Sequence, residues 1–80
     1  MYLPDIVNTI NAVFGDDITN CYFSNEAKNS SVTFEFDHEY DLKGNASEIL
    51  STIKNNAAGD DHYSIEFDYE IFSVTVEKNE

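Results

Sequence analysis

Two stretches of the chain alternate apolar with acidic residues: Val32-Thr33-Phe34-Glu35-Phe36-Asp37-His38-Glu39-Tyr40-Asp41 and Tyr63-Ser64-Ile65-Glu66-Phe67-Asp68-Tyr69-Glu70-Ile71. Successive side chains of an extended strand point to opposite faces of its sheet. Each stretch therefore predicts a strand with aromatic and aliphatic side chains on the core face and a row of carboxylates on the other.

The second stretch continues to residue 77 and changes its phase on the way. Its apolar residues fall at odd positions from 63 to 71 and then at even positions, Phe72, Val74 and Val76. A period of two residues cannot change phase without an inserted residue or a break. Because no turn-forming residue lies at Ile71-Phe72, we expect a β-bulge there, with a tight chain reversal as the alternative.

Two helices flank these strands in the sequence. Apolar residues at helical spacing predict a helix over residues 4–14, with Pro4 in its first turn and Gly15 after its end. A second apolar face predicts another helix, which Asn45 would cap with Glu48 three residues later and which Gly59 would end. Residues 42–45 then form a connection.

A weaker strand is expected over residues 18–24, followed by a polar hairpin loop over 25–31 that contains Lys28. The predicted order is α-β-β-α-β in one domain spanning residues 1–80. The fold class is α+β: an antiparallel sheet of three strands, or four if the last segment reverses, with two helices packed on one face.

The charge of the chain restricts its partners. Sixteen acidic residues against four lysines give a formal charge of −12. DNA, RNA and anionic membrane surfaces would repel such a protein, so we expect neither direct nucleic-acid binding nor membrane association. The lone Cys21 allows no intrachain disulfide, and the N-terminus has no signal-peptide pattern, so we expect a cytoplasmic protein.

The acidic rows are the candidate partner-binding site. A merely solvated sheet face would mix Thr, Ser, Lys and Glu, whereas seven predicted solvent-facing positions, alternate residues from 35 to 41 and from 66 to 70, are all acidic, which favours a basic protein partner. Tyr69 is a candidate contact anchor, because tyrosine is enriched at interfaces. The predicted contact residues are Glu35, Asp37, Glu39, Asp41, Glu66, Asp68, Glu70 and Tyr69. The alternative is a solvated face without a partner.

Other chemistry has little support in the sequence. His38 falls on the apolar side of its predicted strand, so we expect it to be buried. The cluster Asp60-Asp61-His62 could contact a divalent metal, but it lacks the spacing of a known calcium loop. There is no glycine-rich phosphate loop and no sign of an activated nucleophile. We therefore expect no catalytic residue, no metal and no cofactor, and not an enzyme.

In size, charge and the pattern Phe34-Glu35-Phe36-Asp37 and Ile65-Glu66-Phe67-Asp68-Tyr69-Glu70, the chain resembles phage-encoded DNA-mimic inhibitors. That class includes anti-CRISPR proteins, uracil-DNA glycosylase inhibitors and anti-restriction proteins. The resemblance implies an inhibitor that occupies the basic nucleic-acid-binding cleft of an effector, foremost a Cas effector, in the cytoplasm of the host cell. The alternatives are an immunity protein against a basic nuclease toxin and a non-inhibitory acidic adaptor domain.

Overall fold

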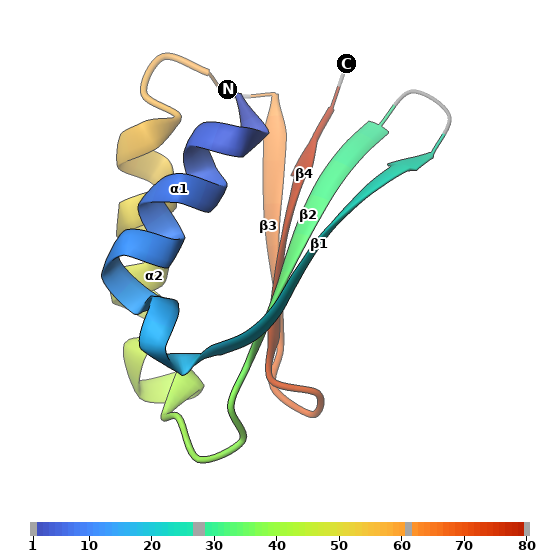
Figure 1. Ribbon diagram of the computed structural model, residues 1–80. Helices are drawn as coiled ribbons and strands as arrows, with labels where there is room; N and C mark the ends of the chain where they lie inside the picture. Colours follow the sequence, from blue (N-terminus) through green and yellow to red (C-terminus); the bar gives the residue numbers. More distant parts are fainter. Residues whose placement is uncertain (1, 27–28, 61, 80) are drawn as a thin grey trace.

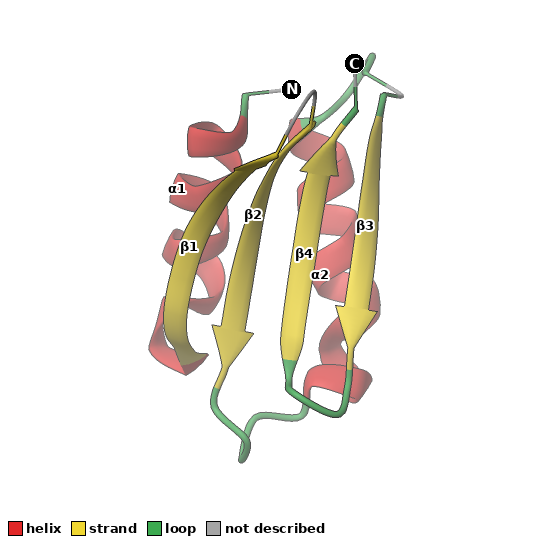
Figure 2. Ribbon diagram, turned by 90° about the vertical axis from the view of Figure 1, so that its right-hand side faces the viewer, coloured by secondary structure: helices red, strands yellow, loops and turns green. Residues whose placement is uncertain are grey.

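The computed structural model describes residues 2–26, 29–60 and 62–79. Their elements, in chain order, are α1 (Leu3–Phe14), the short 3-10 helix η1 (Gly15–Asp17), β1 (Ile18–Glu26), β2 (Asn29–Phe36), α2 (Leu42–Asn56), β3 (Tyr63–Asp68) and β4 (Ser73–Lys78). Both α-helices lie on one face of a four-stranded antiparallel sheet, and the described residues leave its other face open (Figures 1 and 2). The predicted α+β class is confirmed, with a fourth strand at the end of the order.

The last strand in the chain, β4, lies inside the sheet. The strand order is β1-β2-β4-β3, so β4 pairs with β2 on one side and with β3 on the other (Figure 2). Phe34, for example, pairs with Val74, which in turn pairs with Phe67. The two acidic strands of the sequence, β2 and β3, are therefore not neighbours.

The core lies between the helices and the covered face of the sheet. Burial of each large apolar side chain stabilises the fold by about 1.5–3 kcal/mol before chain entropy is subtracted. The helices contribute buried residues at the predicted spacing, and β2 and β4 contribute every second residue: Leu3, Ile6, Ile10, Phe14, Leu42, Ile49, Ile53, Val32, Phe34, Phe36, Val74 and Val76.

The change of phase near Ile71-Phe72 is a chain reversal, so the predicted bulge is wrong and the alternative is correct. Residues 69–72 connect β3 to β4, and the two strands pair from Tyr63↔Lys78 to Asp68↔Ser73. The turn contains no glycine or proline. Instead Phe72 adopts a positive φ of 54°, a conformation that bulky residues rarely adopt. The Asp68 carboxylate accepts the backbone N–H of Glu70 at 3.0 Å, a side-chain hydrogen bond that is typical of turns.

The second helix begins earlier than predicted. It starts at Leu42, and its cap is Asp41, whose Oδ1 accepts the Gly44 N–H at 3.0 Å. A Cβ on Gly44 would overlap the Asp41 carboxylate, so this glycine makes room for the cap. Asn45, the predicted cap, lies inside the helix and donates from its side chain to the Asp41 carbonyl oxygen at 2.8 Å.

The first helix begins at Leu3, one residue before the predicted start, and Gly15 is right-handed and opens η1. Strand β1 ends at Glu26 and β2 begins at Asn29, so both strands extend into the predicted hairpin loop. Lys28 lies outside the described residues. Neither α1 nor α2 is long and apolar enough to cross a membrane, and no other described segment forms a helix that is.

Candidate partner-binding surface at one end of the sheet

The predicted contact residues separate into three places. Glu35, Glu66 and Asp68 lie on strands and face outward, because their neighbours Phe34, Phe36, Ile65 and Phe67 face the core. Strand β2 ends at Phe36, so Asp37, Glu39 and Asp41 lie in the loop to α2 and not on a strand as predicted. Glu70 and Tyr69 lie in the turn between β3 and β4.

The open face of the sheet does not carry two adjacent rows of carboxylates. Its cross-strand pairing gives one row with Asn20, Glu35, Ser73 and Asp68, a second with Tyr22, Thr33, Thr75 and Glu66, and a third with Ser24, Ser31, Glu77 and Ser64. The hydroxyls of Thr33 and Thr75 are 3.0 Å apart at the centre. This mixed face is the composition expected of a solvated sheet surface, and it weakens the prediction that the sheet face resembles a row of phosphates.

The carboxylates gather instead at one end of the sheet, where the loop from β2 to α2 and the turn from β3 to β4 extend in the same direction (Figures 1 and 2). The Asp37 N–H donates to the Asp17 carbonyl oxygen at 2.8 Å, which joins this loop to η1. The Phe36 N–H donates to the Phe72 carbonyl oxygen, also at 2.8 Å, which joins it to the turn. We call this surface the acidic pole and define it by Asp16, Asp17, Asp37, Glu39, Asp41, Asp68 and Glu70.

Apolar side chains lie among these carboxylates. Ile71 at the tip of the turn is 55% exposed, and Tyr69 is 43% exposed. The rings are held in place by stacking: His38 on Phe72 at 4.6 Å between centroids, and Tyr40 on Phe36 at 5.1 Å. His38 is therefore exposed at the pole and not buried as predicted, because the strand alternation stops at Phe36. An exposed apolar group ringed by charge is typical of an interaction surface.

Lysine is nearly absent from the pole. Of the lysines that the structure describes, Lys43 lies there, with its Nζ 6.0 Å from the centroid of the Tyr69 ring. Lys54 is in the last turn of α2, and Lys78 pairs with Tyr63 at the opposite end of β3. The pole therefore has a concentrated negative charge that the rest of the described surface lacks.

The surroundings of Tyr40 change the pKa of its side chain. Burial raises the pKa of its phenol, and the nearby carboxylates of Asp17, Glu48 and Asp41 raise that pKa further.

The Cys21 thiol, on β1, has a pKa that burial raises, so it is a poor nucleophile at neutral pH.

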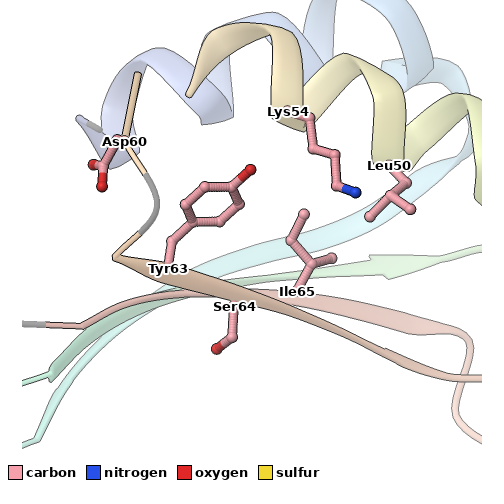
Figure 3. A pocket seen from close by; sticks show the side chains of 6 residues that line it. All are labelled: Leu50, Lys54, Asp60, Tyr63, Ser64 and Ile65. Carbon is pink, nitrogen blue, oxygen red and sulfur yellow. The ribbon is translucent and has the colours of Figure 1, made fainter. Parts of the chain in front are cut away.

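Two hollows open on the described surface, one at the pole and one away from it. Asp16, Asp17, Asp37, Glu39, Tyr40 and Asp41 line an open hollow of ≈ 320 Å³ at the pole. A second hollow of ≈ 400 Å³ lies between α2 and β3, away from the pole. Figure 3 shows Tyr63 and Ile65 directed toward Lys54 and Leu50 of α2, whereas Ser64 points to the other side of β3.

Within the part of the chain that the structure describes, no group of three or more His, Cys, Asp or Glu side chains is placed to hold a metal ion. Of the candidate cluster Asp60-Asp61-His62, Asp61 lies outside the described residues. The Asp60 carboxylate accepts the His62 N–H at 2.8 Å, which closes a turn before β3.

Sequence reasoning missed Asp16, Asp17 and Ile71 as members of this surface. Asp16 and Asp17 lie between the predicted first helix and first strand, and their proximity to the loop after β2 depends on the tertiary fold. Ile71 was expected inside the sheet, and the phase change beside it was the available signal that it lies in a turn. Comparisons with protein-family models, with curated proteins and with solved structures give no match to this chain.

Proposed function

We propose that this protein is an inhibitor that binds the basic nucleic-acid-binding cleft of an effector protein through its acidic pole and excludes DNA or RNA by competition. The observation that carries the proposal is that η1, the loop after β2 and the turn after β3 meet at one end of the sheet, where the carboxylates of the acidic pole lie together with the exposed side chains of Tyr69 and Ile71. A cleft lined by lysine and arginine would attract this charge over a long range, and the apolar side chains would add short-range affinity.

The most specific form of this proposal is an anti-CRISPR protein that acts on a Cas effector in the cytoplasm of a phage-infected cell. It rests on the class resemblance in size, charge and acidic pattern. The same pole would serve an immunity protein that neutralises a basic nuclease toxin. The effector used in the experiment separates these two forms of one mechanism.

A second function is favoured by the mixed Ser, Thr and Glu composition of the open sheet face. In an adaptor domain without inhibitory activity, the charge would only keep the protein soluble. Capture experiments at low salt distinguish it, because an adaptor of this kind would retain no basic nucleic-acid-binding protein.

Competition with labelled DNA tests the proposal directly. A fluorescent duplex is bound to a Cas effector–guide complex, or to a basic nuclease in a parallel series, and its release is measured as the protein is added. Two variants with the same net charge are compared. The pole variant carries Asp37→Asn, Glu39→Gln and Glu70→Gln, and the face variant carries Glu35→Gln, Glu66→Gln and Glu77→Gln.

Each variant changes the formal charge from −12 to −9, since each neutralises three carboxylates. We expect the pole variant to lose about tenfold or more in inhibition and the face variant to lose about threefold or less, because close charge pairs dominate over long-range ones. Equal losses would assign the effect to total charge and reject the pole as the contact surface. If the protein displaces nucleic acid from no basic effector, the result favours the adaptor function.

A further inference from the structure

A small pocket of ≈ 280 Å³ opens at the pole between the loop after β2 and the turn after β3. Aromatic rings form most of its wall: Tyr40 and His38 from the loop, and Tyr69 and Phe72 from the turn. Leu42, which is 1% exposed, also lines the pocket, together with the charged residues Asp41 and Lys43. The pocket therefore combines a mainly aromatic lining with one acidic and one basic residue.

The walls are held in place before any ligand arrives. Tyr40 stacks on Phe36, His38 on Phe72, and Tyr69 on Phe67 at 5.8 Å between centroids. Phe36 is a core residue, so the ring on it is anchored to the sheet. Asp41 is fixed by its bond to the Gly44 N–H. A preformed pocket loses little conformational entropy when it is filled.

This chemistry fits one class of side chain. A guanidinium group is planar, stacks on aromatic faces, pairs with carboxylates and is less strongly hydrated than an ammonium group. A neutral apolar side chain would not compensate the charge of Asp41, and an anion would meet the negative potential of the pole. We propose that this pocket receives an arginine side chain of the basic partner, an inference that rests on the proposed function.

The position of Lys43 provides a specific test of the proposed arginine site. Its Nζ lies 6.0 Å from the Tyr69 centroid, so the free protein already places a cation over one wall of the pocket. A guanidinium group that enters the pocket would lie close to the Lys43 ammonium group, and two positive charges at short range repel each other. Removing the Lys43 charge therefore strengthens arginine binding, although most substitutions at an interface weaken it.

The first experiment needs no identified partner. N-acetyl-arginine-amide and N-acetyl-lysine-amide are titrated into isotope-labelled protein, and aromatic chemical shifts are followed by NMR. We expect arginine to shift the resonances of Tyr40, Tyr69 and Phe72 in one saturable process, with lysine at least about threefold weaker. Equal and unsaturable effects of the two compounds, spread over all the carboxylates, would overturn the pocket.

Substitutions then test the walls, and each has a matched control. Tyr69→Ala should weaken arginine binding about threefold, which corresponds to one cation–π contact at an exposed site, whereas Tyr69→Phe should retain it. Asp41→Asn should weaken it by a similar factor, because asparagine keeps the helix cap and removes the charge. Glu66→Gln removes one charge from the open sheet face and should leave the binding within about 1.5-fold of the parent protein.

Lys43→Gln is the most discriminating variant. It should tighten the binding of N-acetyl-arginine-amide by about two- to fivefold, while Lys54→Gln, an equal change of charge on the same helix, should have less than half of that effect on a logarithmic scale. Weaker binding in Lys43→Gln would mean that the lysine helps to form the site, and would refute an arginine pocket.

The two proposals fail in different ways. If the pocket binds arginine selectively but the protein displaces no nucleic acid from any basic effector, the inhibitor function is wrong and the pocket stands. If the protein displaces nucleic acid and neither Tyr69→Ala nor Lys43→Gln changes its affinity for the effector, the pole acts by charge alone and the pocket is wrong.

Discussion

Glu35 of β2 and Asp68 of β3 occupy the same cross-strand row of the sheet, and Ser73 of β4 lies between them. Neighbouring strands are about 4.8 Å apart, so the insertion of one strand roughly doubles the backbone separation of these two acidic positions. The interleaved Ser73 and Thr75 dilute the charge of the open face. The densest charge is therefore in the loops at the end of the sheet.

Salt should stabilise the protein against unfolding. The formal charge of −12 opposes the compact state by self-repulsion, and the loops at the pole hold several of these charges close together. Urea unfolding at about 20 mM and at about 300 mM NaCl should give a larger free energy of unfolding at the higher salt, since screening shortens the range of repulsion. The pole variant should show a smaller increase than the face variant. An unfolding free energy that falls with salt would contradict this.

Two phenylalanines with their side chains on the helix side of the sheet should differ sharply in their contribution to stability. Phe34 on β2 is 1% exposed, whereas Phe23 on the edge strand β1 is 52% exposed. Phe34→Ala should cost about 3–5 kcal/mol, a large part of the stability of a domain of this size. Phe23→Ala should cost about 1 kcal/mol or less. Chemical denaturation followed by circular dichroism measures both, and similar losses would show that Phe23 is covered in solution.

The cap of α2 gives a third prediction. Asp41→Ala removes the acceptor for the Gly44 N–H and should destabilise the protein by about 1 kcal/mol. Asp41→Asn should retain most of the stability, because asparagine caps helices as well as aspartate does. Asn45→Ala is the control at the position that the sequence pattern favoured, and it should cost less than Asp41→Ala. The reverse order of losses would place the cap at Asn45.

Tyr40 predicts a dependence on alkaline pH. Its pKa in the folded protein is raised by burial and by the carboxylates of Asp17, Glu48 and Asp41. The neutral phenol is therefore favoured by folding. Its contribution to stability is fully present below the unfolded pKa of about 10 and is lost as pH rises through the higher folded value. NMR titration of the Tyr40 ring should show a pKa above the ordinary tyrosine value.

A charge variant tests the cause of this shift. Glu48→Gln removes one of the carboxylates that act on Tyr40 and should lower its pKa toward the ordinary value, while Glu77→Gln, on β4, should leave it unchanged. If neither variant moves the Tyr40 titration, Glu48 does not contribute to the raised pKa of Tyr40.

Patterns within single elements were readable from the sequence. The apolar spacing from Leu3 to Phe14 predicted α1 to within one residue, and the alternation up to Phe36 predicted the buried face of β2. Beyond Phe36 the same alternation continues into a loop, so it placed Asp37, His38 and Glu39 on a strand that ends before them. Local periodicity does not record where the hydrogen-bonded ladder stops.

The turn after β3 was hard to predict for a different reason. Its sequence has no residue that prefers a positive φ, and the tertiary structure places Phe72 in that conformation while its ring stacks on His38. Similarly, both Asp41 and Asn45 are good caps by residue type, and the space beside Gly44 favours the first. The strand order, and with it the location of the acidic pole, depends on pairings between distant segments that no local pattern reports.

The position of β4 has a consequence for biosynthesis. Because residues 73–78 pair with both β2 and β3, the two halves of the sheet can join only when this segment has left the ribosome. Until then the apolar face of the β1–β2 hairpin has no central strand beside it, and the negative charge of the chain opposes its association with other copies. The four-stranded sheet therefore cannot be completed before β4 is available to pair with both neighbours.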